Sequence, residues 1–495
     1  MLETLAMAQL AAALLNTPCE NLLSLEVPGG TIASAESVAA GPFTPPGGFG
    51  PRGAAARPSE PIPAHCRVKM VLTPTSDSNI NVELWMPLEN WNGKFLAVGN
   101  GGWAGAIQGY GDMQAALRRG YAAAATDTGH SAEDGPAGMF ALGHPEKVVD
   151  FAYRAVHDMA VKSKRVIDAF YEPPIDYSYF KGCSTGGRQA VMAAQRYPGD
   201  FDGIIAGALA NRHIHMHTAA SAIDIHLSRH PEEAVSEAQA RLVNETVMQQ
   251  CDTLGEGFLN NPSQCSVDFS QLQCGATSSG VCLTDAQLRT VETYFGGLKN
   301  SRGETIFAGQ AYGNPMRAMA GSGDAPGPFA FDTIRILGFQ DADYDWRDFD
   351  LDRDMARIDA AAAFVDAVDP DLRAFEAHGG KLLLYHGWGD TGITPKNTIE
   401  YYESVLAEMG PEQADWMRLF MVPGMGHCGG GPGPNTFDSI GVLEQWREQG
   451  DAPEAIMARN PASALERPLC PYPEYAQHDG SGDLADAANW TCAAE

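Results

Sequence analysis

The sequence predicts an α/β protein whose core is a mainly parallel sheet with helices on both sides. The first observation is a series of short, continuous apolar runs, which suit central strands that are buried on both faces. Stretches with apolar residues at helical spacing separate these runs, and strands that alternate with helices imply parallel pairing. The third observation is that this alternation fades between about residues 211 and 368, which marks an inserted segment.

The apolar runs end in glycine-rich or polar loops. We expect strands at residues 94–98, 121–125, 177–180, 201–206, 381–385 and 418–422. We expect helices between them at residues 145–169, 188–196 and 397–409. Active sites in sheets of this type lie at the carboxyl ends of the strands, so the chemistry is expected in the loops that follow these runs.

The middle of the chain differs in composition from the rest. Residues 211–368 hold four of the ten cysteines, a glycine- and proline-rich run at 321–328 and an acidic run at 341–354. The sequence therefore predicts a catalytic core made of residues 1–210 and 369–495, with residues 211–368 inserted as a lid domain.

The composition limits the partners of the protein. The 495 residues are 44% hydrophobic, which is ordinary for a globular chain with a large core. The formal net charge of −29 comes from 62 acidic against 33 basic residues. Such a surface repels phosphate backbones and anionic membranes, so we expect neither as a partner, although the charge also serves solubility. We expect a small-molecule substrate and a monomer or weak oligomer.

The cysteines indicate an oxidising compartment. Their number is even and no CxxC motif is present, which argues against a zinc or redox site and favours disulfides over unrelated buried thiols. We therefore expect a secreted or periplasmic protein, although Met1 to Leu15 lack the basic region and cleavage site of an intact signal peptide. The cysteines are Cys19, Cys66, Cys183, Cys251, Cys265, Cys274, Cys282, Cys428, Cys470 and Cys492.

Ser184 is the predicted nucleophile. It is the central residue of a Gly-Cys-Ser-Thr-Gly sequence that matches G-x-S-x-G, follows a predicted strand and precedes a predicted helix. Small residues must flank a serine on so sharp a turn, and the helix N-terminus directs amide N–H groups at negative charge. The alternatives are a glycine-rich loop with an incidental serine, or Cys183 as the nucleophile, which points to the wrong side of the turn.

A serine nucleophile needs a base, and the base needs an acid that orients it. In folds of this type the order along the chain is serine, acid, histidine. Asp390 follows one late predicted strand, and His427 lies just beyond the next. Position at the last strand end favours His427 over His386 and His130, which also end strands. Asp127 is the rival to Asp390 as the orienting acid.

Two backbone donors are predicted to form an oxyanion hole. One is the N–H of Thr185, the residue after the nucleophile. The other is expected from Gly101 or Gly102, in the glycine-rich loop after the first predicted central strand, because glycine lets the backbone approach the substrate. The alternative is that these glycines form only a turn.

Two cysteines adjoin the predicted catalytic residues. Cys183 precedes Ser184, and Cys428 follows His427. If the serine and the histidine act together, the two sulfurs lie near each other, and a disulfide between them would fasten the two loops and keep their geometry rigid.

The sequence resembles a known family, the tannase and feruloyl esterase family, which also contains hydrolases of mono(2-hydroxyethyl) terephthalate. The resemblance covers most of the chain. The segments that carry it are residues 99–102, 126–130, 179–207, 386–390, 422–428 and 468–473.

The resemblance implies an α/β-hydrolase core with a lid inserted after the strand that follows the nucleophile helix. It also implies Ser184, Asp390 and His427 as the catalytic triad. The disulfides that it implies are Cys183 with Cys428, Cys19 with Cys66, Cys251 with Cys265, Cys274 with Cys282, and Cys470 with Cys492.

One feature departs from the family pattern. Its members commonly hold a structural calcium in the lid, on an aspartate-rich loop just after a cysteine. In this chain the corresponding loop, residues 251–260, is shortened and retains one aspartate. Asp252, Glu256 and backbone carbonyls are the available ligands, and calcium takes six to eight oxygens. We therefore do not expect calcium to be retained, and no cofactor is required for the chemistry.

The function that these expectations describe is a secreted serine carboxylesterase. The resemblance implies an aromatic acyl group, of feruloyl, galloyl or terephthalate monoester type. The alternatives are a catalytically silent binding protein or a peptidase on the same scaffold. Three residues that adjoin the predicted catalytic loops are expected either to line the substrate pocket or to belong to the core: Trp103, Trp388 and Ile393. His386 is also expected to line the pocket.

Overall fold

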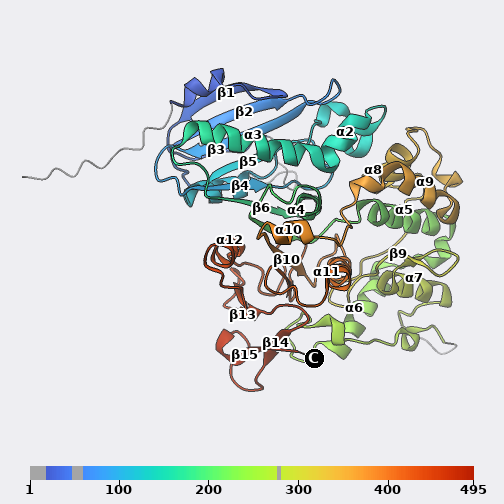
Figure 1. Ribbon diagram of the computed structural model, residues 1–495. Coiled ribbons are helices and arrows are strands. Elements are labelled where there is room, and N and C mark those ends of the chain that lie inside the picture. Colours follow the sequence, from blue (N-terminus) through green and yellow to red (C-terminus); the bar gives the residue numbers. More distant parts are fainter. Residues whose placement is uncertain (1–17, 47–59, 276–279, 495) are drawn as a thin grey trace, which may run out of the picture.

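The computed structural model describes residues 18–46, 60–275 and 280–494, so the start of the chain from Met1 to Leu15 lies outside the described residues. A nine-stranded sheet runs through the molecule in the order β1-β2-β3-β5-β4-β6-β7-β10-β11 (Figure 1). Its strands are β1 (Gly30–Val38), β2 (His65–Leu72), β3 (Ile80–Pro87), β4 (Lys94–Val98), β5 (Ala122–Thr126), β6 (Tyr177–Cys183), β7 (Gly203–Gly207), β10 (Lys381–Gly387) and β11 (Met417–Val422).

The larger part of this sheet is parallel. Strands β5, β4, β6, β7, β10 and β11 pair in parallel, whereas β1, β2 and β3 form an antiparallel extension that joins β5. All five residues of β5 and of β7 are buried, as continuous apolar strands covered on both faces should be. The predicted fold class, an α/β-hydrolase core with a mainly parallel sheet, is confirmed.

Helices cover both faces of the sheet. Successive residues of one strand therefore pack against helices on opposite faces. Leu382 and Leu384 belong to the core cluster under α3, α4 and α11, whereas Leu383 belongs to the cluster under α1 and α12. Figure 1 shows α3 crossing the face of β3 and β5. These helices are α1 (Tyr110–Arg118), α3 (Ala155–Phe170), α4 (Thr185–Arg196), α11 (Pro395–Met409) and α12 (Ser439–Glu444), with the short helices α2 (Pro145–Val149) and α10 (Arg373–Ala377).

Residues 211–368 form helices that gather on one side of the molecule, at the right in Figure 1. Two hydrophobic clusters, separate from those that flank the sheet, hold them together. One cluster also includes Trp103 and Phe151, so this segment packs against the loop that follows β4. The elements are α5 (His213–Arg229), α6 (Glu237–Cys251), α7 (Asp285–Gly296), β8 (Leu298–Lys299), β9 (Thr305–Phe307), α8 (Pro328–Asp332) and α9 (Leu351–Ala362).

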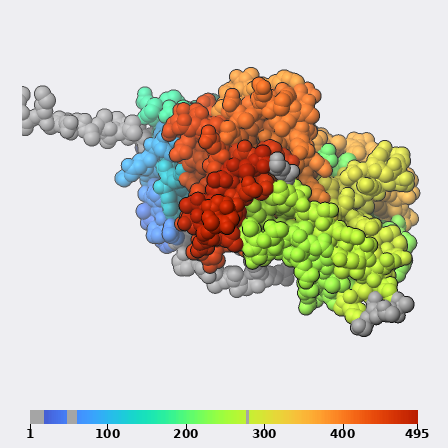
Figure 2. Space-filling view, turned by 90° about the horizontal axis from the view of Figure 1, so that it is seen from below, coloured from blue at the N-terminus to red at the C-terminus, as the bar shows by residue number. Residues whose placement is uncertain are grey.

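The chain ends in two small hairpins beside the inserted segment. In Figure 2 the C-terminal segment, in red, lies against the green segment that precedes residue 265. Hydrogen bonds from Arg467 and to Ala476 connect the two. The hairpin strands are β12 (Ile456–Arg459), β13 (Glu466–Leu469), β14 (Tyr475–His478) and β15 (Trp490–Ala493).

Five disulfides lie in the described chain, with sequence separations from 8 to 245 residues. No helix in the described ranges is long and apolar enough to cross a membrane. The disulfide pairs are the ones that the resemblance implies: Cys19–Cys66, Cys183–Cys428, Cys251–Cys265, Cys274–Cys282 and Cys470–Cys492.

Candidate active site

Ser184 lies at the turn between β6 and α4 in a backbone conformation that non-glycine residues rarely adopt, with φ 65° and ψ −123°. The turn is held in place because the Ser184 N–H donates to the Gly207 carbonyl at 3.0 Å. A Cβ on Gly182 would come within 2.3 Å of the Gly186 carbonyl oxygen, so only glycine allows strand and helix to meet this closely. The serine therefore caps a helix N-terminus at the carboxyl end of a central strand.

The loop after β4 packs directly on this turn. The Gly186 N–H donates to the Asn100 carbonyl at 2.7 Å. Asn100 in turn exchanges hydrogen bonds with the Gln189 side chain, at 3.0 and 3.2 Å. These contacts fix residues 99–102 against the first two turns of α4.

The two predicted oxyanion glycines differ in their hydrogen bonds. The Gly101 N–H already donates to the Gln108 side chain at 2.7 Å, so it is engaged. Gly102 has φ 57°, and its carbonyl accepts from the Thr185 hydroxyl at 2.6 Å. Thr185 is buried at the first position of α4. The structure thus links Thr185 to Gly102, and it gives Gly101 a supporting position.

Asp390 is a fully buried carboxylate with four hydrogen-bond donors. One oxygen accepts from the backbone N–H groups of Gly392 and Ile393, at 2.7 and 2.9 Å. The other accepts from His427 Nδ1 at 2.8 Å and His386 Nε2 at 3.1 Å. Burial acts to raise the pKa of Asp390, but hydrogen bonds and charges from the two histidines outweigh it and hold the pKa well below its usual value.

Exposure distinguishes the two histidines that share Asp390. The His386 side chain is 0% exposed, and its Nδ1 is engaged with the Thr398 hydroxyl at 2.7 Å. The His427 side chain is 37% exposed. Since only an accessible imidazole can exchange protons with a substrate, His427 is the candidate base, and His386 orients Asp390 from behind. The expectation that His386 lines the substrate pocket is therefore wrong.

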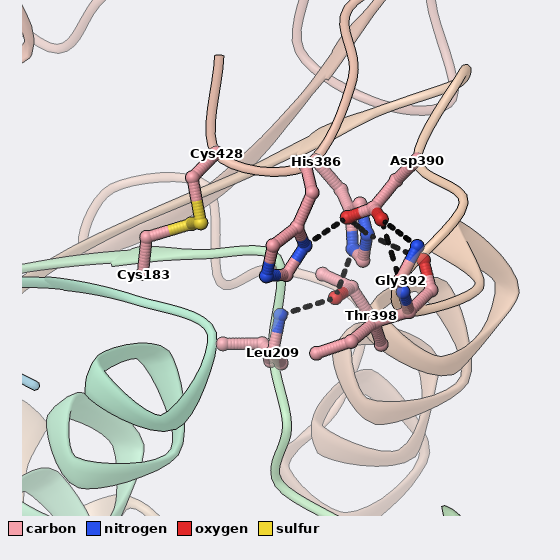
Figure 3. Close-up of a disulfide and its surroundings, with 9 residues drawn as sticks. Cys183, Leu209, His386, Asp390, Gly392, Thr398 and Cys428 are labelled. Atoms are coloured by element: carbon pink, nitrogen blue, oxygen red, sulfur yellow. Dashed lines mark hydrogen bonds and ion pairs between the residues drawn. A yellow bond between two sulfur atoms is a disulfide. The ribbon is translucent and has the colours of Figure 1, made fainter. Parts of the chain in front are cut away.

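A disulfide joins the serine turn to the histidine loop. Cys183 and Cys428 have Cα atoms 5.9 Å apart, although they are separated by 245 residues in the chain. Figure 3 shows this disulfide close to Asp390 and its hydrogen-bond partners. Because the neighbours of the two cysteines are Ser184 and His427, the disulfide brings the loops of the predicted nucleophile and base together.

The side chains expected beside the catalytic loops are mostly core. Trp103, Trp388 and Ile393 are each 5% exposed or less. Trp103 packs against Phe151, with ring centroids 5.5 Å apart, and belongs to the cluster that holds the inserted segment. Of the two possibilities left open by the sequence, burial favours a core position for these three residues.

Phe329 is an exposed aromatic side chain at the site, and sequence reasoning did not single it out. It belongs to α8 in the inserted segment and is 56% exposed. A Cβ built on Gly102 would come within 3.3 Å of its ring, so the ring lies against the candidate oxyanion loop. Its carbonyl accepts from the Trp103 indole N–H at 2.7 Å, which fixes the start of α8.

A second contribution from the inserted segment is Asn314. Its side chain is 1% exposed and donates to the Asp390 carbonyl at 2.6 Å. No local pattern marks this asparagine, because its partner lies 76 residues away in the chain.

The rival residues have partners elsewhere. Asp127 accepts from the Asn81 backbone and side chain, at 2.9 and 2.6 Å, so it ties β3 to the loop after β5. The His130 ring stacks on Phe140 with centroids 3.7 Å apart, and burial lowers the pKa of His130 to about 4. Both residues support the loop after β5.

The loop that the resemblance associates with calcium does not fit a cation. The Asp252 carboxylate accepts three backbone N–H groups within the loop, at 2.8 to 3.2 Å. Glu256 forms an ion pair with the buried Arg467 at 2.6 Å. Within the part of the chain that the structure describes, no three His, Cys, Asp or Glu side chains are placed together to hold a metal ion. Both Asp252 oxygens and Glu256 Oε1 thus have protein partners, and only Glu256 Oε2 is buried without one. A single unpartnered oxygen is far short of the six to eight that calcium takes.

Comparisons with known proteins found one matching family and several relatives that cover most of the chain. A family model described as tannase and feruloyl esterase matches residues 66–493. An esterase of Xanthomonas campestris pv. campestris is 36% identical over 99% of this chain and 94% of its own length. Mono(2-hydroxyethyl) terephthalate hydrolase of Piscinibacter sakaiensis is 30% identical over 88% of this chain and 85% of its own length. The crystal structure of feruloyl esterase B from Aspergillus oryzae has 30% identity and a TM-score of 0.85, and the match covers 96% of this chain and 99% of that one.

Proposed function

Because this chain belongs to the tannase and feruloyl esterase family, and is a carboxylic ester hydrolase, we propose that it cleaves esters of aromatic carboxylic acids through a serine acyl-enzyme. The observation that carries the mechanism is the hydrogen bond from the accessible His427 to the buried Asp390. A disulfide joins the His427 loop to the Ser184 turn. That arrangement has the serine, base and orienting acid of a hydrolytic triad.

The proposed reaction uses the following groups. The Nδ1–H of His427 donates a hydrogen bond to the ionised Asp390, which leaves Nε2 as the basic nitrogen. Nε2 takes the proton of the Ser184 hydroxyl while Oγ attacks the ester carbonyl carbon. The Thr185 and Gly102 N–H groups stabilise the oxyanion. The carbon–oxygen bond to the alcohol then breaks, and the alcohol leaves with the proton from Nε2.

Water completes the proposed cycle. Nε2 of His427 removes a proton from water, and the resulting hydroxide attacks the acyl carbon bound to Ser184. Collapse of this second tetrahedral intermediate releases the carboxylic acid and returns the proton to the serine. Throughout, Asp390 stays ionised and stabilises the imidazolium, for which its lowered pKa suits it.

The proposed acyl site lies between the core and the inserted segment. We propose that residues 211–368 act as a lid and that Phe329 contacts the aromatic ring of the acyl group. The exposed phenyl ring beside the candidate oxyanion loop is an apolar surface. Packing of an aromatic acyl group against it is favourable because aromatic rings pair favourably. The names of the relatives support an aromatic acyl group, since feruloyl and terephthalate esters both carry one.

We also propose that the protein works outside the cytoplasm. Five disulfides suit an oxidising compartment such as the periplasm or the medium. The chemistry described above uses side chains and backbone groups alone, so it requires no cofactor.

The direct test is Ser184→Ala. We expect hydrolysis of a p-nitrophenyl ester to fall by about a millionfold, to the level left by binding and the oxyanion hole, with an unchanged circular dichroism spectrum. A fluorophosphonate should label Ser184 of the native protein, as shown by peptide mass spectrometry. Substantial activity of the folded variant, or labelling of another residue, would contradict the proposal. A kinetic panel of methyl ferulate, methyl gallate, mono(2-hydroxyethyl) terephthalate and an anilide then identifies the substrate class.

A further inference from the structure

Arg467 is a completely buried cation far from Ser184 in the sequence. It belongs to β13, its side chain is 0% exposed, and its guanidinium donates to Glu256 at 2.6 Å and to Asn260 at 3.0 Å. The same guanidinium lies 3.5 Å from the ring centroid of Trp490, in β15. Burying a charge is costly unless it is paired and hydrogen-bonded, so this arrangement is a specific construction and not a surface contact.

The two acceptors lie in the loop at residues 252–260, which is held by hydrogen bonds within the protein. Asp252 holds the first half of the loop because its carboxylate accepts N–H groups from Gly255, Glu256 and Gly257. Arg467 holds the second half through Glu256 and Asn260. A fixed positive charge bound to the Glu256 carboxylate would repel a calcium ion at the same place.

The loop in turn supports the segment that carries His427. Phe258 is buried, and a Cβ built on Gly424 would come within 2.8 Å of its ring. Gly424 has φ 61°, in the left-handed region, and lies three residues before His427. The Phe258 ring thus packs directly on the backbone of the His427 loop. It leaves no room for a side chain at position 424.

We propose that the Arg467 guanidinium takes the place of a metal ion in this loop. It holds residues 252–260 in the position where Phe258 supports the His427 loop. Arg467 is accordingly a positioning residue for the base. This inference rests on the proposed role of His427, but its metal-free part stands independently.

The first test uses the native protein. We expect the melting temperature to be the same in excess EDTA and in excess calcium chloride, because a ligand that binds only the folded state raises stability and the proposal gives this loop no calcium to lose. A fall of several degrees in EDTA that calcium reverses would overturn the metal-free part of the proposal.

The second test is Arg467→Ala, assayed with millimolar guanidinium, far below denaturing concentrations. We expect kcat to fall about tenfold or more with a smaller change in KM, because displacement of a catalytic group by an ångström can cost about a hundredfold. Guanidinium should restore part of kcat by filling the vacated site, whereas calcium should not. Wild-type kcat in the variant, or rescue by calcium alone, would overturn the proposal.

The matched control is Arg418→Ala. Arg418 also lies near a tryptophan, 5.8 Å from the Trp446 ring, but donates to the backbone carbonyls of Ala414 and Pro453. We expect its kcat to stay at the wild-type value and to show no response to guanidinium. If guanidinium raised kcat equally in both variants, the rescue would be nonspecific and the proposal would fail.

A further pair of variants covers the case in which Arg467→Ala does not fold. Replacing both charges, in Arg467→Met with Glu256→Leu, should lower the melting temperature by clearly less than the sum of the single changes, because each single change strands a buried charge. Strict additivity would overturn the pairing. Fluorophosphonate labelling of Ser184 separates the two proposals. Absence of labelling in the native protein contradicts the proposed function and with it the positioning role of Arg467, whereas labelling of the native protein with unchanged kcat in Arg467→Ala contradicts the positioning role alone.

Discussion

The loops that follow β6, β10 and β11 carry their chemistry in short local patterns, whereas the inserted residues 211–368 contribute side chains that no local pattern marks. Ser184, Asp390 and His427 each lie within a few residues of a strand end. Phe329, by contrast, lies in a helix of five residues. Its ring lies against Gly102, which is more than 200 residues earlier in the sequence. The difference follows from how each region is positioned.

Strand ends are positioned by the sheet itself. Parallel pairing of β6 with β7, β7 with β10 and β10 with β11 sets three loops side by side, so a motif at each end is enough to assemble the site. The inserted segment is positioned by its own hydrophobic clusters and by single contacts such as Asn314 to Asp390. Its contribution to the site therefore depends on contacts between residues that are distant in sequence.

The variant with the largest expected effect is Asp390→Asn, which tests the role of the loops at the strand ends. An asparagine keeps the volume but loses the charge that His427 and His386 stabilise, and its amide N–H₂ favours the wrong imidazole tautomer. We expect kcat to fall about ten-thousandfold, the loss typical of this change in a triad. The measurement is steady-state hydrolysis of a p-nitrophenyl ester. Thr398→Val, which removes the outer partner of His386 and the acceptor of the Leu209 N–H, should cost far less; equal losses would mean that His386 is the working base.

The Cys183–Cys428 disulfide tests whether the assembled loops need a covalent link. We expect the double change to serine to lower kcat about tenfold to a hundredfold, because the Ser184 and His427 loops lose their fixed separation. It should also lower the melting temperature, since this disulfide closes a loop of 245 residues.

The matched control is the Cys274–Cys282 pair in the inserted segment. It closes a loop of only 8 residues, so its replacement by serine should leave kcat unchanged and lower the melting temperature less. The same loss of kcat from both double variants would show that the disulfides act through global stability and not through the catalytic loops.

The sequence predicted the parallel part of the sheet because its strands are continuous apolar runs. It did not predict β3, in which Asn81 and Glu83 interrupt the apolar pattern. The reason is that Glu83 is buried as part of a polar cluster: it accepts from Arg67 at 2.6 Å and from the Trp85 indole at 2.7 Å. A buried ion pair between strands is a tertiary feature, and no periodicity in one strand reveals it.

The same limit applied to the site. The Ser184 turn has a steric signature of close glycines, which a sequence displays directly. The role of His386 depends on which of two histidines is buried, and the role of Arg467 depends on acceptors more than 200 residues away. Burial and long-range partners are properties of the folded chain, so motif reasoning identified these residues incompletely or not at all.

Phe329→Ala tests the contribution of the inserted residues 211–368 to the site. We expect KM for an aromatic acyl ester to rise about tenfold, the value of roughly 1 kcal/mol or more for a lost aromatic pair, with little change for an acetyl ester. The control is Met457→Ala, which removes a side chain of similar exposure, 55% against 56%, from β12. A uniform change for aromatic and acetyl esters would mean that Phe329 serves the fold and not the acyl group.

The prediction furthest from catalysis concerns the pH dependence of stability, and it arises at His130, in the loop after β5. Burial lowers the pKa of His130 to about 4 from an ordinary value of 6.5, so between these values the unfolded chain binds the proton and the folded chain does not. Stability is therefore lost as the pH falls from about 6.5 towards 4. In His130→Phe the ring stacking on Phe140 is kept and this loss is removed, which amounts to about 3 kcal/mol at the acid end. Melting temperatures across this range should fall less steeply than for the wild type, whereas the exposed His378→Phe should follow the wild-type curve. Parallel curves for His130→Phe would show that the imidazole is already protonated in the folded loop.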